Sequence, residues 1–122
     1  MRSGPSLGKS ERLQYGQEFR KVYEQGRRCA GRVAVLYVRE RTEPGRPSRR
    51  VGVVSGRRLG GAVKRNRARR LLREVYRQHK SQLKENIELV MVARPALLEL
   101  SWSEIERELV RQFAEAGIWR GD

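Results

Sequence analysis

Hydrophobic positions recur with a helical period between Gly61 and His79, in the segment GAVKRNRARRLLREVYRQH. One side of the helical wheel carries residues at i, i+3, i+4 and i+7 spacing: Ala68, Leu71, Leu72, Val75, Tyr76 and His79. A separate stripe is polar and mostly arginine: Asn66, Arg69, Arg70, Arg73, Arg77 and Lys80. The segment therefore predicts an amphipathic helix that packs one face on a core and presents the other to solvent or to a polyanion.

A shorter helix is predicted over residues 13–25, where four side chains fall on one face: Tyr15, Phe19, Val22 and Tyr23. Gly26 follows, and we expect it in the left-handed conformation that ends many helices. Aromatic side chains on one helical face favour core packing. A platform on which unpaired bases stack is the alternative, and periodicity does not separate the two.

Apolar runs before and after the basic helix show the pattern of strands instead. Residues 33–38, 51–54 and 87–93 are rich in Val, Leu and Ile, and residues 27–32 begin the first strand or form a short one before it. Two prolines and a glycine in residues 43–49, EPGRPSR, predict a loop that makes a hairpin connection. The strand–helix–strand order around the basic helix is a βαβ unit, so its two strands should be parallel.

A last helix is predicted over residues 103–116, with its buried face made of Ile105, Leu109, Phe113 and Ala116. Residues 101–104, SWSE, fit the capping box S-x-x-E that starts a helix. Trp102 and Trp119 flank this helix, and packing is favoured over base stacking for both.

The length of 122 residues and the lack of an internal repeat predict a single domain over residues 1–122. Residues 1–12 are polar, basic and without periodicity, so we expect a mobile arm there.

The net charge of the chain is +14, and it is unevenly distributed along the sequence. Residues 1–80 carry 23 Lys or Arg against 6 Asp or Glu, whereas residues 81–122 carry 5 against 8. Such segregation indicates a binding face, with nucleic acid as the leading class of partner.

Side chains for catalysis are scarce. His79 and Cys29 are each the only residue of their kind, the only aspartate is Asp122, and no H-x-x-x-H or C-x-x-C spacing offers metal ligands. If the protein takes part in cleaving RNA, we expect another component to carry the chemistry. No apolar run has the length of a signal peptide core or a membrane span, which predicts a cytoplasmic protein without a membrane partner.

Residues 60–74, GGAVKRNRARRLLRE, closely resemble the RNR signature of the bacterial ribonuclease P protein family. Further segments resemble the family's first helix, central strand and the strands on either side of the motif: FRKVY at 19–23 followed by Gly26, VLY at 35–37, RVGV at 50–53 and VARP at 92–95. The resemblance covers about residues 10–116. The ordered set is highly specific, although RNR alone is a weak signal.

The resemblance implies an α+β fold: a single-domain α/β sandwich of the ribosomal protein S5 domain 2-like type. Its element order is αβββαβα, and its βαβ crossover is left-handed, against the usual rule. It also implies a protein subunit of ribonuclease P that binds the catalytic RNA subunit and the 5′ leader of precursor tRNA. The RNA uses Mg²⁺ to remove the leader, the protein binds no cofactor of its own, and the protein alone is expected to be a monomer.

Roles for individual residues follow from the matched positions. The RNA-docking set comprises Lys64, Arg65, Asn66, Arg67, Arg69, Arg70 and Arg73, with Arg57 and Arg58 in the preceding turn. The set expected to line the leader cleft comprises Phe19, Tyr23, Val35 and Tyr37, with Tyr15 at the rim. Gly56 departs from the serine that family members often carry before the basic pair.

Other functions compete with this hypothesis. A ribosomal or other structural RNA-binding protein of related fold would also be small and basic. A self-sufficient nuclease is disfavoured because acidic clusters are missing, and a membrane-binding helix would need a wider apolar face than residues 68–79 supply.

Overall fold

The computed structural model describes residues 11–42 and 48–121. The helices and strands are α1 (Gly16–Gln25), β1 (Arg27–Ala30), β2 (Ala34–Glu40), β3 (Arg49–Val54), α2 (Ala62–His79), β4 (Ile87–Ala93) and α3 (Trp102–Glu115). This is the order αβββαβα expected from the resemblance. The predicted N-terminal arm lies outside the described residues except for its last two, as does most of the predicted loop over residues 43–49.

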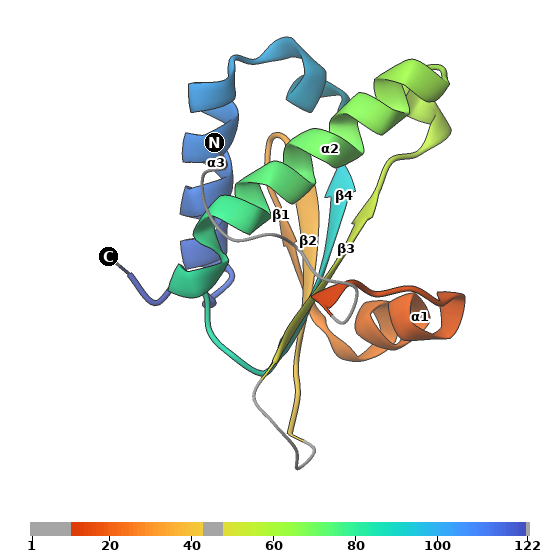
Figure 1. The fold of residues 1–122 in the computed structure, drawn as a ribbon. Coiled ribbons are helices and arrows are strands. Elements are labelled where there is room, and N and C mark those ends of the chain that lie inside the picture. The colour runs from red at the N-terminus through yellow and green to blue at the C-terminus, as the bar shows by residue number, and fades with distance from the viewer. Residues whose placement is uncertain (1–10, 43–47, 122) are drawn as a thin grey trace.

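The four strands form one mixed sheet with the order β1-β2-β4-β3 (Figure 1). β3 and β4 are parallel, as the βαβ pattern predicted. β1 is a separate short strand, antiparallel to β2. The predicted hairpin across residues 43–49 is wrong, because β4 lies between β2 and β3 and pairs with both. β4 is buried along almost its whole length, and an apolar strand of that kind is most stable in the middle of a sheet. The handedness of the crossover stays a prediction.

The main core lies on one face of the sheet, under α2 and α3 (Figure 1). The predicted apolar stripe of α2 is confirmed: Ala68, Leu72, Val75 and Tyr76 are buried, while Leu71 and His79 lie at its partly exposed edge. Leu36 and Val38 of β2 meet this stripe from the sheet. Burial of this set, at about 25 cal/mol for each Å² of apolar surface, is what fixes α2 on the sheet.

α3 begins as its sequence predicted. Ser101 caps the helix by accepting a hydrogen bond from the Glu104 backbone N–H, and the Glu104 carboxylate accepts one from the Ser101 backbone N–H. The predicted buried face of Ile105, Leu109, Phe113 and Ala116 is confirmed. Trp102 and Trp119 pack against the main core, in agreement with a packing role.

α1 covers part of the opposite face of the sheet, where Val22 contacts the buried Leu13 and Val90 in a second, smaller core. The helix starts three positions later than predicted, at Gly16. Gly26 does not adopt the left-handed conformation, since its φ is −88° and its ψ is 167°. It is close contact that favours glycine there: a Cβ would lie 2.5 Å from the Val22 carbonyl oxygen and 2.7 Å from that of Val38.

Candidate nucleic-acid interface

The basic face of α2 comprises the predicted residues Lys64, Arg65, Asn66, Arg67, Arg69, Arg70 and Arg73. Strand β3 ends at Val54, and the 3-10 turn Arg57–Leu59 leads the chain into the helix. All of these residues are exposed except Arg65 and Arg69, which are half-buried. Arg57 and Arg58 are exposed in the turn, beside the N-terminus of the same helix. The structure therefore gathers the predicted RNA-docking residues at one end of α2.

These residues do not form a single stripe. Lys64 and Arg67 line a hollow with Pro95, Leu98 and the acidic Glu99, on the side of α2 that faces the segment after β4. Arg73 instead lines a hollow at β3, together with Phe19 from α1. The basic side chains thus wrap around the first half of the helix, and a bound polyanion has access to them from more than one side.

Ser55 joins the end of β3 to this helix. Its hydroxyl donates to the Arg65 carbonyl oxygen over 3.1 Å and accepts from the Arg69 guanidinium over 2.6 Å. Arg69 also donates to the Asn66 side chain. Arg69 therefore helps to hold the helix against the end of the strand, and Asn66 orients the Arg69 guanidinium from within the helix. The more freely presented cations are the neighbours of Arg69 on the basic face. Nothing in the sequence pattern distinguished these roles.

Charge neutralisation differs along α2. In its second half, Arg77 pairs with Glu74 and Lys80 pairs with Glu11. Hydrogen bonds from Arg77 and Gln78 lower the pKa of Glu74, which keeps that carboxylate ionised. In the first half, no acidic side chain of residues 11–42 or 48–121 forms an ion pair with the basic face. The excess positive charge is therefore concentrated where the RNR sequence lies.

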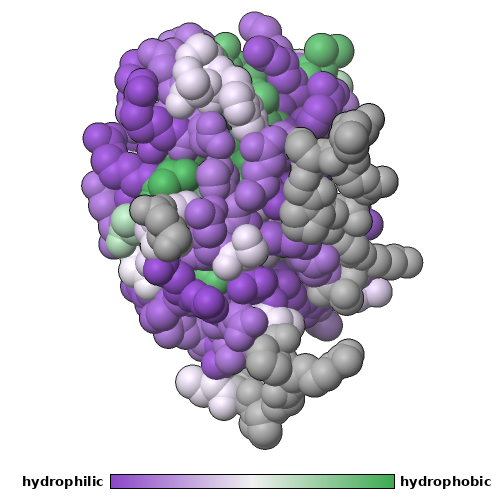
Figure 2. Space-filling view, turned by 60° about the vertical axis from the view of Figure 1, so that its left-hand side comes forward, coloured by the Kyte–Doolittle hydropathy of each residue, from purple (hydrophilic) through white to green (hydrophobic). Residues whose placement is uncertain are grey.

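The face turned forward in Figure 2, which is the left-hand side of Figure 1, is mostly hydrophilic. Its hydrophobic residues appear as small separate patches between polar ones. Large contiguous apolar patches usually mark apolar partners, and the coloured part of this face shows no such patch. In the described part of the chain, no helix has the length and apolar character needed to cross a membrane.

An aromatic surface, made of Phe19, Tyr23 and Tyr37, lies on the opposite side of the sheet. The rings of Tyr23 and Tyr37 meet edge to face, with centroids 4.8 Å apart and planes at 87°. Phe19 lies against Gly52 of β3, where a Cβ would come within 2.4 Å of the ring. Gly52, Val90 and Tyr37 are register partners across three strands, so α1 crosses the sheet along this row.

Exposure bears on the two interpretations of the aromatic residues. Tyr23 is 39% exposed, Phe19 and Tyr37 are partly buried, and the fully buried side chain on this face of α1 is Val22. Burial followed by the nearby Tyr37 raises the pKa of Tyr23, which keeps its hydroxyl protonated and able to donate. Core packing therefore accounts for Val22 but leaves part of each aromatic residue accessible.

An aliphatic row extends the aromatic surface towards the end of β3 that leads into α2. Val35, Val92 and Val54 are register partners on β2, β4 and β3, one row beyond the aromatic residues, and all three are partly buried. Val35 is thus beside Tyr37 on the same strand face, as expected. Tyr15 is the N-cap residue of α1 and is 62% exposed. Its expected place at the rim of a leader cleft stays a prediction.

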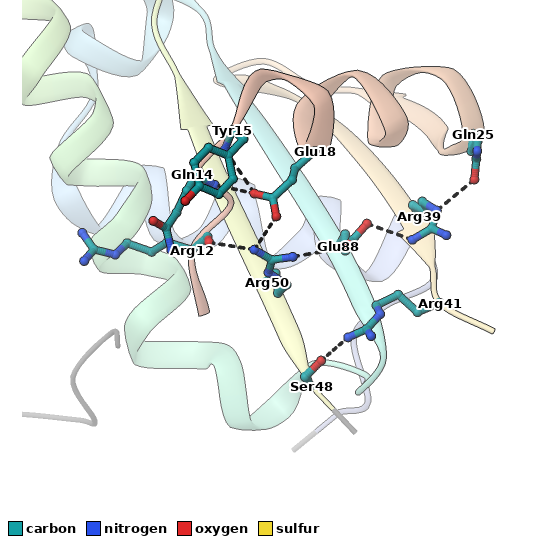
Figure 3. Close-up of polar contacts among 10 residues, drawn as sticks. All are labelled: Arg12, Gln14, Tyr15, Glu18, Gln25, Arg39, Arg41, Ser48, Arg50 and Glu88. Carbon is teal, nitrogen blue, oxygen red and sulfur yellow. Dashed lines mark hydrogen bonds and ion pairs between the residues drawn. The ribbon is translucent and has the colours of Figure 1, made fainter. Parts of the chain in front are cut away.

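A polar network on the other side of the aromatic row positions α1 (Figure 3). Glu88 of β4 pairs with Arg39 at 2.9 Å and with Arg50 at 3.8 Å, and Arg50 reaches Glu18 of α1 at 2.8 Å. Arg39 also donates to Gln25 at the end of the helix. Arg39 and Glu88 are each only 7% exposed. The network ties both ends of α1 to the sheet, and sequence reasoning missed it because its members are far apart in the chain.

Glu18 is the link between this network and the helix start. Its carboxylate accepts hydrogen bonds from the backbone N–H groups of Gln14 and Tyr15 as well as from Arg50. Burial raises the pKa of Glu18, but these hydrogen bonds outweigh it and lower the pKa below its ordinary value. The ionised form thus stabilises the first turn of α1, which carries Tyr15 and precedes Phe19.

Residues that sequence analysis considered for chemistry have structural contacts. His79 contacts Glu106 through Nε2 at 2.7 Å and Gln82 through Nδ1 at 3.0 Å. Burial raises the pKa of the Cys29 thiol, and this disfavours the reactive thiolate. Among the described residues, no three His, Cys, Asp or Glu side chains lie close enough together to hold a metal ion.

At Gly56, where family members often carry serine, a Cβ would meet nothing within 4 Å, so the position is surrounded by open space.

The mixed sheet, the helices on its two faces and the basic RNR helix define this chain as an RNA-binding α+β protein. A family model described as Ribonuclease P matches residues 7–117. The ribonuclease P protein component of Symbiobacterium thermophilum is 39% identical over 112 residues, covering 92% of this chain and 96% of the relative. The chain belongs to the ribonuclease P protein family. Members of this family are components of a tRNA-processing endoribonuclease that contains an RNA subunit.

Solved structures agree with this assignment. A Staphylococcus aureus RNase P protein mutant, described as defective in mRNA degradation activity, has a TM-score of 0.81 and 27% identity, covering 91% of this chain and 92% of that one. The RNase P protein from Thermotoga maritima, with a TM-score of 0.75 and 24% identity over 86% of this chain and 96% of that one, shows the same fold.

Proposed function

We propose that this chain binds the catalytic RNA of ribonuclease P through the basic face of α2 and the 5′ leader of precursor tRNA through the aromatic surface. It thereby assists endonucleolytic removal of the leader. The observation that carries this proposal is the division of the surface. Unneutralised cations lie at one end of α2, and partly exposed rings lie across the sheet from it.

The basic face suits the backbone of a folded RNA. Arg67, Arg70 and Lys64 are exposed, and guanidinium groups bind phosphate through paired hydrogen bonds. Each phosphate contact releases condensed counterions, so binding is driven by charge and weakens with salt. Protein cations that take the place of bound metal ions would also lower the Mg²⁺ that the RNA needs. In this proposal Mg²⁺ is bound by the RNA, which carries out the hydrolysis, and the protein holds no cofactor.

The aromatic surface suits a single strand. Unpaired bases stack on exposed rings with little dependence on sequence, which is what leaders of different tRNAs require. Tyr23 and Tyr37 fix each other's ring planes, and Phe19 is fixed against β3 by Gly52. A surface arranged in advance loses less entropy on binding than mobile side chains would. Val35 and Val54 extend it with an aliphatic floor.

Reconstitution tests this function. The purified chain is mixed with a bacterial ribonuclease P RNA and precursor tRNA at a Mg²⁺ concentration at which the RNA alone is slow. We expect the chain to stimulate cleavage at the mature 5′ end and to bind precursor tRNA more tightly than mature tRNA. Absence of stimulation would show that the chain is not the subunit and would favour a structural RNA-binding role.

The protein without RNA is the essential control. A related S. aureus RNase P protein mutant is described as defective in mRNA degradation activity, so incubation of this chain alone with an mRNA and with precursor tRNA measures any activity of its own. We expect neither to be cut. Sedimentation of the same sample is expected to give a monomer, and fractionation of cells is expected to place it in the cytoplasm.

A further inference from the structure

A hollow of about 130 Å³ lies at the outer edge of β3, between the two surfaces described above. Phe19 and Gly52 line it from the side of α1, and Arg73 lines it from α2. Arg12 and Val53 complete the wall. β3 is at the edge of the sheet, and the hollow there has lining residues from both surfaces, Phe19 of the aromatic surface and Arg73 of the basic face of α2.

The hollow is positively charged, and no described acidic side chain supplies it with a counterion. Neither Arg12 nor Arg73 forms an ion pair with a described acidic side chain. Partial burial, followed by the charges of Arg69 and Arg12, lowers the pKa of Arg73. The guanidinium groups therefore repel each other across the hollow, and a bound anion would relieve that repulsion.

The backbone of β3 adds a donor. Leu13 donates to the Val51 carbonyl oxygen over 2.9 Å, and Arg12 and Val51 form an isolated parallel bridge. Val51 therefore points its backbone polar groups outward, and by the alternation of a strand Val53 does the same. Among the described residues no further strand or bridge covers this edge, so the Val53 N–H faces the hollow.

We infer that this edge is a phosphate subsite for the single-stranded leader, in which Arg12 and Arg73 bind one phosphodiester while the adjoining base contacts Phe19. The inference rests on the proposed function. Arg12 and Arg73 supply the charge, Val53 supplies a hydrogen bond, and Phe19 supplies the adjoining ring. A duplex is excluded from this role because its stacked bases cannot reach a ring beside its own phosphates. The subsite leads the strand around β3 from one face of the sheet towards the RNR sequence.

Arg12 is the residue to change. Its carbonyl oxygen accepts from Arg50, and its bridge to Val51 uses the backbone, so Arg12→Gln leaves both contacts in place. Figure 3 shows its guanidinium pointing away from the polar network. Arg107→Gln is the matched control: it removes the same charge from α3, which packs on the opposite face of the sheet from α1.

The experiment measures binding of precursor tRNA to the reconstituted holoenzyme, with one leader phosphate at a time replaced by an uncharged methylphosphonate. Arg12→Gln is expected to weaken binding of the unmodified substrate about tenfold, as loss of one charge-assisted contact would. At one linkage the methylphosphonate should weaken wild-type binding more than it weakens binding by Arg12→Gln, in which only Arg73 still supplies charge to that phosphate. Arg12→Lys should keep most of the salt dependence, and Arg107→Gln should behave as wild type.

Other results overturn the inference. If methylphosphonates weaken Arg12→Gln and wild type equally at every linkage, Arg12 contacts no leader phosphate. If Arg12→Gln weakens assembly with the catalytic RNA by the same factor with and without substrate, the subsite belongs to that RNA. If wild type does not distinguish precursor from mature tRNA, the proposed function itself fails, and this outcome is separate from the other two.

Discussion

The basic face of α2 and the aromatic surface are built in different ways. Seven neighbours in sequence supply the basic face, on one helix. Residues of α1 and β2 supply the aromatic surface, which also depends on Gly52 of β3 and on a buried polar network. The basic face therefore forms wherever α2 forms, whereas the aromatic surface exists only in the folded sheet. Substitutions should therefore affect the basic face and the aromatic surface differently. Some remove a single side chain that contacts RNA, and others disturb the packing on which the aromatic surface depends.

The largest effect is expected from Glu88→Ala, which would break the support of the aromatic surface. Removal of this carboxylate takes away the Glu88 end of a 2.9 Å ion pair with the buried Arg39, and the expected loss is about 3 kcal/mol of unfolding free energy. Urea denaturation measures it. Glu108→Ala is the control, because it removes a carboxylate from an i, i+3 pair with the exposed Arg111 and should cost under about 1 kcal/mol. Equal losses would show that the network is not a significant support.

Gly52→Ala tests the contact between β3 and Phe19. The new Cβ would lie 2.4 Å from the ring, so Phe19 must move, at a cost of about 1–3 kcal/mol in stability. Binding of leader-bearing substrate should fall, while binding of the catalytic RNA should stay unchanged. Gly56→Ala is the matched control, because a Cβ there meets nothing within 4 Å. A loss of catalytic-RNA binding in folded Gly52→Ala would contradict the separation of the two surfaces.

Phe19→Ala removes one ring from the aromatic surface. Precursor tRNA should bind more weakly by about 1–3 kcal/mol if a base stacks on Phe19, with little change for mature tRNA. Direct binding to the holoenzyme measures both, and circular dichroism verifies that the variant is folded. Equal losses for the two RNAs would assign Phe19 to folding.

Arg70→Ala compares an arginine of α2 that has no ion pair in the described structure with Arg77, which is paired with Glu74. The exposed Arg70 side chain has no ion pair in the described structure, so its loss should reduce the log–log salt slope of catalytic-RNA binding by about 0.9 for one phosphate contact. Arg77→Ala removes an arginine of the same helix that is already paired with Glu74, and it should change the slope less. The same slope change in both variants would mean that pairing within the protein does not matter.

The smallest effect is expected from Glu18→Gln, as a pH-dependent loss of unfolding free energy. Because the folded-state pKa of Glu18 is lowered from its ordinary 4.5, its contribution to stability is complete above that pH and declines as pH falls through the folded-state pKa. Urea unfolding should therefore show Glu18→Gln less stable than wild type at neutral pH, with a difference that shrinks as the pH falls below 4.5 and through the lowered folded-state pKa. Glu24→Gln, on the exposed side of α1, is the control. A difference that is constant with pH would exclude ionisation as its cause.

Local features were predictable because they depend on neighbours in the chain. The bounds of β4, the span of α2 and the capping box of α3 follow from period, composition and short-range hydrogen bonds, and the structure agrees with all of them. The resemblance to the family supplied the element order. The set of basic residues at the start of α2 was also predictable, because these residues are close together in the sequence of one helix. The roles of individual side chains within that set were not predictable, since Arg69 is committed to Ser55 across a turn.

Features that depend on residues distant in sequence were decided only by the tertiary structure. The hairpin expected between β2 and β3 is replaced by pairing of both with β4, because an apolar strand buried on both faces belongs at the centre. The pairing of Arg39 with Glu88 arises from strand register. The contact of Phe19 with Gly52 and the hollow lined by Arg12 and Arg73 arise from the packing of helices on the sheet. The sequence by itself determined a basic helix and the leading class of its partner. The fold decided which aromatic residues stay accessible and that a hollow at the edge of β3 lies between the two surfaces.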